Sequence, residues 1–406
     1  MDRSRRLYFD NAATSFPKPP RVLEAMRHYA EHVGASPGRG GYAESLEGTR
    51  VLRTCRERIN RLIHGSAPER VVFTLNTTDA LHLAIAGVVR HRRRTRPGSR
   101  VHLVTTAMDH NSVLRPFNAL AEDGDCVWTC VPVDPETGLV DPEDVRAAIG
   151  KDTALVAVVH ASNVSGTVQP IAEIGAICRD QAVPFLVDAA QSVGHIPIDV
   201  EAMGVDLLAF PGHKGLLGPL GTGVLYLRPG MERVVATVRE GGTGSLSELD
   251  THPGDMPDRY EAGSHNTVGL AGLSEGVAWI LERGVDRLWA HERGLIETMI
   301  ASLNVRGSLE RLRLLGPQGV GDRLGVFSLA HDTIPARDLA DRLENEFGIL
   351  ARAGIHCAPR AHASLGSESG GALRLSVGPF ISPQDVRYAC DALEAVCAEA
   401  ERAAGV

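Results

Sequence analysis

Lysine is nearly absent from this chain of 406 residues. The 42 basic residues comprise 39 arginines and only three lysines, Lys18, Lys151 and Lys214. Lys214 lies in the stretch FPGHKGLLGPLGTG (residues 210–223), where a histidine precedes it and glycines surround it. An amine can lose its proton and react as a nucleophile, whereas a guanidinium stays protonated. Lys214 is either an ordinary surface charge or a residue kept for amine chemistry, and its rarity and position favour amine chemistry.

Long apolar runs and paired cysteines are also missing. No segment approaches the roughly 18 uninterrupted apolar residues of a membrane span, and the charged N-terminus, MDRSRRLYFDNAATS, lacks the apolar core of a signal peptide. The seven cysteines are odd in number, and their spacing indicates neither a disulfide framework nor a CxxC zinc site. No HExxH-like spacing suggests another metal site. We therefore expect a soluble, cytoplasmic protein with reduced thiols, no bound metal and no membrane partner.

Excess positive charge is absent as well. A formal net charge of -8 and a pI near 6.1 argue against a general nucleic-acid binder. One basic run, from Arg90 to Arg94 with Arg96 and Arg100, is either a binding patch or the solvated end of a helix before Pro97-Gly98. We favour the helix end.

Short apolar segments alternate with helical stretches between residues 70 and 230. The expected strands cover residues 71–75, 101–105, 127–133, 154–160, 184–188, 207–210 and 223–227, and helices such as 80–89 and 171–181 lie between them. Continuous apolar strands separated by helices indicate a mainly parallel sheet covered on both faces. Residues 240–270 are rich in Gly, Ser and Pro, which predicts long loops.

The C-terminal part has a different pattern, typical of a smaller α+β domain. Expected helices at 270–283 and up to about 303 precede strands at 323–330 and 372–377 and helices at 336–347 and 383–400. Because one core rarely grows beyond about 250–300 residues, we expect two domains. Residues 1–20 would pack with the small domain, residues 21–280 would form the large domain, and residues 281–406 the small one.

Polar residues follow several of the expected strands, where ligands bind in open α/β sheets. Thr77 and Thr78 begin a helix and either cap it or bind a phosphate. His110 follows another strand and would stack on a planar ligand, act as an acid or base, or close a loop. Asn163 follows a third strand and either contacts a ligand or forms a turn.

Asp188 ends a buried strand, 26 residues before Lys214. A carboxylate there is costly to desolvate unless it has a partner, and the small Ala189 and Ala190 leave room for a flat group above it. The stretch around Lys214 lacks the Gly-Lys-Ser/Thr of a phosphate loop, and no GxGxxG joins a first strand to a helix. A nucleotide or dinucleotide enzyme is therefore disfavoured.

Pyridoxal 5′-phosphate (PLP) fits these residues together. Its phosphate would bind the helix N-terminus at Thr77–Thr78, and its protonated ring nitrogen would give Asp188 a cationic partner. His110 would stack on the ring and Gln191 would bond its phenolic oxygen. Lys214 would attach the cofactor covalently through its amine.

Several motifs resemble the class V aminotransferase superfamily, specifically its cysteine desulfurase and selenocysteine lyase branch. They run along nearly the whole chain and include YFDNAATSFPKP, TLNTTDALHLAI, TAMDHNSVLRP, SNVSGT, VDAAQSVGHIPID, GHKGLLGPLGTGVLY, YEAGSHNT, ARAGIHCAP and RLSVGPF. VDAAQS followed by GHK at this spacing is highly specific for the superfamily. RxGxxC, from Arg352 to Cys357, is specific for the branch that uses a catalytic cysteine.

This resemblance implies a fold and a set of site residues. The fold would be PLP-dependent transferase fold type I, with a mainly parallel central sheet flanked by helices in the large domain and a smaller α+β C-terminal domain. Substrate would contact Asn163, Arg352 and Arg374, and the fork of Arg374 suits a carboxylate. Catalysis would use Lys214, His110 and Cys357. The cofactor would be bound by Thr77, Thr78, His110, Asn163, Asp188, Gln191, His213, Lys214 and Ser264.

Two positions depart from the family pattern. The residue two before the histidine of GHK is often a serine that donates to the phosphate, but here it is Pro211, which has neither hydroxyl nor N–H. Ser264 replaces a common threonine and keeps the hydroxyl. Family dimers lend this position to the phosphate of the partner subunit, so the resemblance implies a homodimer with its active site at the interface.

The implied reaction is a cysteine desulfurase reaction. Lys214 would remove the α-proton of L-cysteine, and the Cys357 thiolate would take the sulfur as a persulfide, leaving L-alanine. His356 or Arg352 would stabilise the thiolate. Cys357 could instead be a buried structural thiol, but the neighbouring Gly354, His356 and Pro359 favour an exposed loop.

Other functions stay open at this point. A related PLP lyase would act on selenocysteine, cysteine sulfinate or a larger cysteine conjugate, without needing a cysteine nucleophile. A scaffold or sulfur-carrier protein that has lost its chemistry is disfavoured by the intact Lys214, Asp188 and Cys357, and aminotransfer would leave Cys357 idle. A sulfur-acceptor protein is a further expected partner, which the sequence does not identify.

Overall fold

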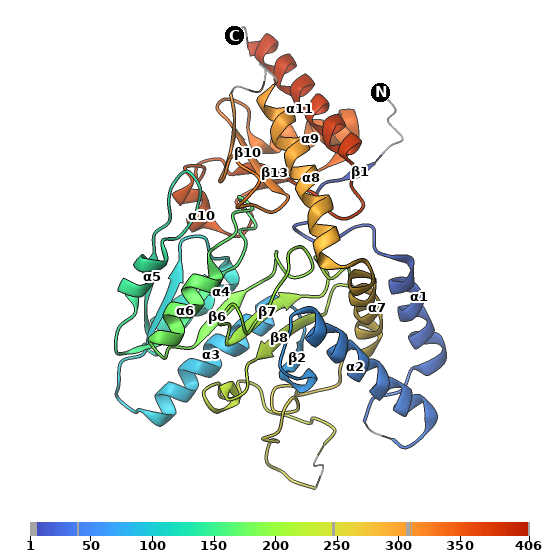
Figure 1. The fold of residues 1–406 in the computed structure, drawn as a ribbon, viewed down its shortest axis with the longest axis vertical. Coiled ribbons are helices and arrows are strands. Elements are labelled where there is room, and N and C mark those ends of the chain that lie inside the picture. The colour runs from blue at the N-terminus through green and yellow to red at the C-terminus, as the bar shows by residue number, and fades with distance from the viewer. Residues whose placement is uncertain (1–5, 39, 246–247, 306–308, 310, 405–406) are drawn as a thin grey trace.

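The computed structural model describes residues 6–38, 40–245, 248–305, 309 and 311–404. Within these residues a large lower part is built on one sheet, and the C-terminal sheet and its helices lie above it (Figure 1). The N- and C-terminal ends both lie at the top of this view. None of the described helices is long and apolar enough to cross a membrane.

The large sheet has seven strands in the order β2-β8-β7-β6-β5-β3-β4. The five strands from β7 to β4 are parallel, and β8 runs antiparallel to both β7 and β2. The strands are β2 (Val71–Thr74), β3 (His102–Thr106), β4 (Val127–Val131), β5 (Thr153–Val159), β6 (Phe185–Asp188), β7 (Leu207–Pro211) and β8 (Gly223–Leu227). All seven expected strands are therefore present, and the expected mainly parallel sheet is confirmed.

Helices cover both faces of this sheet, as its continuous apolar strands require. On one face Val156 and Val158 pack with apolar residues of α2, α6 and α7. On the other face Leu155 and Ala157 pack with residues of α3 and α4. Burying each such Val or Leu side chain contributes about 1.5–3 kcal/mol. The helices of this part are α1 (Pro20–His28), α2 (Ala43–Leu62), α3 (Thr77–Thr95), α4 (Asn111–Glu122), α5 (Pro142–Ala148), α6 (Ile171–Asp180) and α7 (Thr267–Arg283), with short turns η1 (Tyr29–Val33), η2 (Pro68–Arg70) and η3 (Met231–Arg233).

The C-terminal sheet is antiparallel, with the order β12-β13-β10-β9. A separate parallel pair joins β1 to β11, so that the N-terminal segment lies on the C-terminal part. The core of this part is formed mainly by α8, α9, α11, β10 and β13. Its elements are α8 (Val285–Asn304), β9 (Leu312–Leu314), β10 (Val326–His331), α9 (Ala336–Phe347), β11 (Ile349–Leu350), β12 (Arg352–Gly354), α10 (Pro359–Ser364), β13 (Ala372–Ser376) and α11 (Pro383–Ala404), and β1 is Leu7–Tyr8.

Local sequence explains where the helices nearest the site begin. The side-chain oxygen of Asn76 accepts a hydrogen bond from Asp79 N and so caps α3. His110 caps α4 through Nδ1, which accepts from Ser112 N. Arg92, Arg93 and Arg94 of the basic run lie in the last turn of α3, whose negative dipole end favours positive charge.

Candidate active site

A cleft of about 680 Å3 lies at the carboxyl ends of the parallel strands. It brings together eight of the residues that the sequence singles out, from segments more than 130 residues apart in the chain. They are Thr77, Thr78, His110, Asn163, Asp188, Gln191, His213 and Lys214. Asn76, Ser112, Val159, Ala161 and Ala190 complete its lining.

Lys214 and Asp188 are both electrostatically perturbed in this cleft. Burial lowers the pKa of Lys214 to about 8, although the negative charge of Asp188 acts in the opposite direction. Burial also raises the pKa of Asp188 to about 6. Asp188 accepts one hydrogen bond at Oδ1, from Ala190 N at 3.0 Å. The cleft thus holds an amine that loses its proton readily and a buried carboxylate to which no cation is bonded among the described residues.

The N-termini of α3 and α4 meet at the cleft through a serine that sequence reasoning missed. Ser112 Oγ lies 2.8 Å from Thr78 Oγ1 and 2.9 Å from His110 Nδ1. Because His110 Nδ1 accepts from Ser112 N, the proton of the neutral ring lies on Nε2. Burial lowers the pKa of His110 to about 4, with the charge of Lys214 as a further cause, so the ring is neutral at physiological pH.

The N-terminal segment fixes the backbone next to Lys214. The carbonyl oxygen of His213 accepts from Ser15 N at 2.9 Å and from the Thr14 and Ser15 hydroxyls at 3.0 Å each. Lys18 Nζ lies 3.4 Å from the same oxygen and donates to Ser15 Oγ at 2.9 Å. Two of the three lysines of the chain therefore lie at one site. Sequence reasoning missed these contacts, because the donors are about 200 residues from His213.

Arg374 lies on β13, directly opposite Arg352 on β12. Arg374 is 1% exposed; its Nη2 lies 2.7 Å from Asp10 Oδ1, and its Nη1 donates to Asn163 O at 3.1 Å. Arg352 forms no ion pair with any of the described residues. Asp10 therefore balances the charge of Arg374, and the positive charge of Arg352 is left for an anionic substrate group.

Cys357 is exposed, on the loop between β12 and α10, as expected from its neighbours. The carbonyl before it, of His356, accepts from Asn163 Nδ2 at 2.7 Å, and its own carbonyl accepts from Asn111 N at 2.9 Å. The loop is thereby bound to two segments that line the cleft. Of the other six cysteines, five are buried and Cys130 is partly exposed.

The proposed role of His356 in stabilising the thiolate by charge does not fit its environment. The ring is buried and bonded to His362, and burial lowers its pKa to about 2, with the charge of Arg374 as a further cause. A neutral imidazole supplies no positive charge. Arg352 is the remaining cation of the RxGxxC motif.

Ser264 and Pro211 lie outside this lining. Ser264 is exposed and lines a separate recess with Leu75 and Gly221. Pro211 is the last residue of β7, paired with Gly223 of β8. Within one chain, Ser264 therefore does not reach the cleft.

The residues of the cleft fit PLP on several grounds. The first-turn N–H groups of α3 and the Thr78 hydroxyl suit a phosphate. A protonated pyridine nitrogen would give Asp188 its missing cation. His213 Nδ1 is buried and has no hydrogen-bond partner among the described residues, so it can bond to a ligand in the cleft. Gln191 donates through Nε2 to Ala12 O at 3.0 Å, which leaves its amide oxygen as an acceptor.

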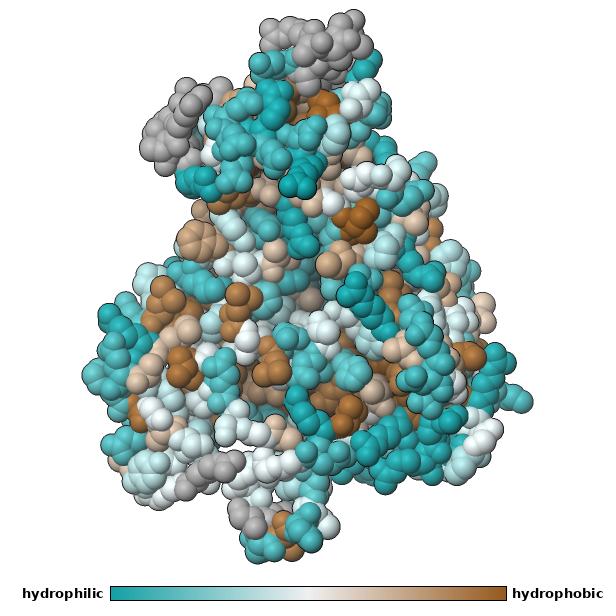
Figure 2. Space-filling view, turned by 180° about the vertical axis from the view of Figure 1, so that it is seen from behind, coloured by the Kyte–Doolittle hydropathy of each residue, from teal (hydrophilic) through white to brown (hydrophobic). Residues whose placement is uncertain are grey.

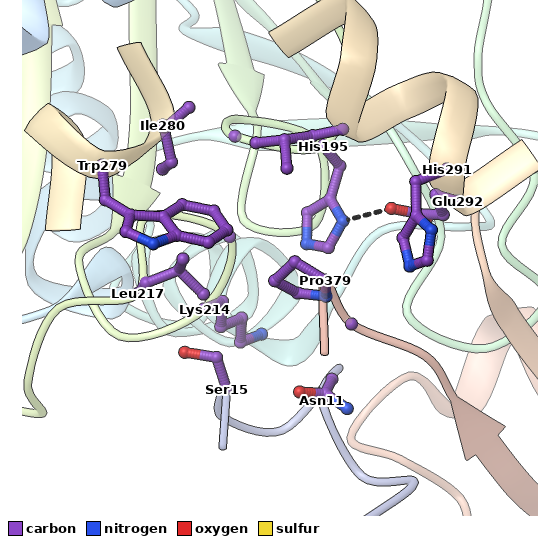
Figure 3. A pocket seen from close by; sticks show the side chains of 14 residues that line it. Asn11, Ser15, His195, Lys214, Leu217, Trp279, Ile280, His291, Glu292 and Pro379 are labelled. Atoms are coloured by element: carbon purple, nitrogen blue, oxygen red, sulfur yellow. Dashed lines mark hydrogen bonds and ion pairs between the residues drawn. The ribbon is translucent and has the colours of Figure 1, made fainter. Parts of the chain in front are cut away.

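A second cavity, of about 430 Å3, also reaches Lys214 (Figure 3). Figure 3 shows His195 bonded to Glu292 in its lining. His195 Nδ1 lies 2.7 Å from Glu292 Oε2. Burial alone would lower the pKa of His195, but the Glu292 carboxylate outweighs it and raises that pKa. Glu292 Oε1 also accepts from Gly325 N at 2.8 Å. The pair therefore joins the loop after β6 to α8 and to the residue before β10.

The fold and the residues of the cleft fit a PLP-dependent transferase, and comparison with known proteins gives the family. Residues 7–388 match the family model described as aminotransferase class-V, and the chain belongs to this family. It is 36% identical over 395 residues to a probable cysteine desulfurase of Methanothermobacter thermautotrophicus, covering 96% of this chain and 94% of that protein. It is 33% identical to a cysteine desulfurase of Yersinia pseudotuberculosis, covering 87% and 84% of the two chains.

Solved structures agree with this assignment. An apo structure of a cysteine desulfurase from Thermococcus onnurineus matches with a TM-score of 0.88 and 31% identity, over 97% of this chain and 95% of that one. A cysteine desulfurase from Escherichia coli matches with a TM-score of 0.83 and 25% identity, over 96% and 94%. The expected superfamily and fold are thus confirmed, and family members typically depend on PLP.

Proposed function

We propose that this protein is a PLP-dependent cysteine desulfurase that converts L-cysteine to L-alanine and carries the sulfur on Cys357. The observation that supports this most is the attachment of the exposed Cys357 loop to Asn163 and Asn111, at the edge of the cleft that holds Lys214 and Asp188. A thiol placed there can reach the sulfur of an amino acid bound in the cleft. The names of the similar proteins point to the same reaction.

The residues of this chain divide the work as follows. PLP, when bound, supplies an electron sink that stabilises negative charge at the substrate Cα. Arg374 and Arg352 bind the substrate carboxylate. Lys214, whose pKa of about 8 leaves a fraction of the amine neutral, removes the Cα proton. His110 would stack on the cofactor ring as a neutral imidazole and so would add no charge to the site.

The Cys357 thiolate then attacks the substrate sulfur. A sulfur–sulfur bond forms while the substrate Cβ–S bond breaks, and the electron pair of that bond stays with the carbon side. Carbon takes up protons to give L-alanine, and Cys357 becomes a persulfide. The reaction is redox-balanced within the substrate and needs no outside oxidant; a thiol reductant or an acceptor protein then removes the sulfur.

We also propose that the active enzyme is a homodimer. Leu75 and Leu220 are 58% and 66% exposed, and Leu75 lines the recess that contains Ser264. A second copy on this face would bury both leucines and bring its Ser264 hydroxyl to the cleft. On the face opposite that of Figure 1, apolar side chains are spread among polar ones over the large part (Figure 2).

The test compares Cys357→Ala with the matched control Cys130→Ala, which changes another accessible thiol. Alanine release from L-cysteine should be lost in Cys357→Ala and kept in Cys130→Ala, while both variants keep the visible absorbance of bound PLP. Alanine release is measured with L-cysteine, selenocysteine and cysteine sulfinate, each with and without a reductant. Full turnover of L-cysteine by Cys357→Ala would contradict the proposal and favour a lyase acting without a cysteine nucleophile.

A further inference from the structure

The loop that carries Cys357 has an unusual backbone. His356 and Cys357 are consecutive, neither is glycine, and both have positive φ, of 50° and 58°. L side chains rarely adopt this left-handed region, and two such residues in a row persist only where their surroundings hold them. Since Cys357 is exposed, its own side chain contributes little of this hold.

Contacts to the backbone hold one side of the loop. Asn163 Nδ2 donates to the His356 carbonyl and Asn111 N to the Cys357 carbonyl. Ala358 N, directly after Cys357, donates to Ile355 O at 3.1 Å. These bonds fix the carbonyl groups but not the side chain of His356. Its Nε2 lies 3.5 Å from Arg352 O, and a shorter contact holds its Nδ1.

That contact belongs to a series of buried side chains that lie outside the cleft lining. His356 Nδ1 lies 3.2 Å from His362 Nε2, and the two rings stack with centroids 5.3 Å apart. His362 Nδ1 lies 2.8 Å from Ser367 Oγ. His362 is fully buried, on α10, and Ala358 and Ala361, which precede it in the chain, belong to one apolar cluster with Met108 and Val164.

His356, His362 and Ser367 hold the loop in position and do not act as acids or bases. Burial lowers the pKa of His362 to about 4 and that of His356 to about 2, so each ring is neutral and holds one proton. A single proton then lies between the two rings. The His356 ring is held by His362, and the His362 ring is held by Ser367. Neither imidazole lines the cleft.

We propose that His362 is a positioning residue for Cys357: through its hydrogen bond to His356, it locks the two consecutive left-handed residues that present the thiol to the cleft. This rests on the proposed role of Cys357 as the sulfur acceptor. His362 would act by fixing the loop, not by touching substrate or cofactor.

Two replacements of His362 separate this role from simple packing. Gln places a polar atom near the position of Nε2 and keeps a bond to His356, whereas Asn places one near Nδ1 and keeps only the bond to Ser367. Loss of one buried hydrogen bond predicts about tenfold slower alanine formation by His362→Asn, against about threefold or less for His362→Gln. PLP absorbance should be unchanged in both, because His362 lies outside the cleft.

A second readout needs neither cofactor nor activity. The amide of Asn111 is protected by its bond to Cys357 O, so hydrogen exchange at Asn111 in the cofactor-free protein reports how firmly the loop is held. We expect exchange about tenfold faster in His362→Asn than in the parent or in His362→Gln. Leu339→Ala, in the core of the C-terminal part, is the control: it should lower the melting temperature without this local increase.

If His362→Asn does not fold, Ser367→Ala tests the same series of side chains from its far end and should raise exchange at Asn111 in the same direction. Equal loss of turnover and protection in the Asn and Gln variants, or unchanged protection in the Asn and Ser367→Ala variants, would overturn the proposal. If Cys357→Ala keeps turnover, the proposed function fails instead, while exchange at Asn111 still measures whether His362 holds the loop.

Discussion

The lowered pKa of Lys214 gives the site its most direct electrostatic test. With a pKa of about 8, about a fifth of Lys214 amines are neutral at about pH 7.4, against about one in a thousand for an ordinary lysine. Only the neutral amine reacts with an aldehyde, so PLP uptake by the cofactor-free protein should be about 200-fold faster than an ordinary lysine allows. The rate should rise with pH and level off above about pH 8.

The assay follows PLP uptake by absorbance from about pH 6 to pH 11, a range that spans both pKa values. Burial also lowers the pKa of Lys18 to about 8, so the measurement uses Lys18→Arg to remove that second amine. Asp188 raises the pKa of Lys214, so Asp188→Asn should move the midpoint to lower pH. A midpoint near the ordinary lysine value, or an upward shift in Asp188→Asn, would refute the electrostatic reasoning.

Three further predictions concern stability, substrate binding and assembly. Glu292→Gln should lower the free energy of unfolding, measured by urea denaturation, by about 3 kcal/mol, because it breaks a largely buried pair with His195. Arg53→Ala, which breaks an exposed ion pair, is the control. Equally small losses of stability in the two variants would contradict this prediction. Arg374→Lys should raise KM for L-cysteine roughly 10- to 100-fold with kcat much less affected, since a charge-assisted hydrogen bond is lost; an unchanged KM in steady-state kinetics would remove Arg374 from substrate binding. Leu75→Asp should give a monomer in sedimentation, because it puts a charge into the proposed apolar interface; an unaltered dimer would place the interface elsewhere.

The sheet could be predicted from sequence because its strands are buried on both faces. Residues such as those of β5, TALVAVV, are continuously apolar, and that signal is local. The convergence of Asp188 and Lys214 also followed, since the ends of adjacent parallel strands meet at one edge. The helices α1, α2, α4, α5 and α10 and the strands β1, β9, β11 and β12 were not predicted. The two-residue β1 and β11 are too short to give a periodic pattern, and they owe their pairing to the fold.

Much of the support around the site could not be predicted, because it depends on contacts between distant segments. Ser15 reaches the carbonyl of His213 across 198 residues, and Asp10 reaches Arg374 across 364. Nothing in the local sequence marks either partner. Asn163 lies in a turn and lines the cleft, as expected, but the bond from its amide nitrogen to the Cys357 loop was not foreseen. Ser112 could have been suspected from its position in the helix start at DHNS, next to His110.

The most direct measurement is of sulfur on the protein itself. The PLP-loaded enzyme is mixed with one equivalent of L-cysteine without reductant, and the intact chain and its peptides are weighed by mass spectrometry. The proposed function requires the mass of one added sulfur atom on the peptide containing Cys357, removable by a thiol reductant and equal in amount to the alanine formed. Alanine formed with no added sulfur on Cys357, or with sulfur on another cysteine, would contradict it.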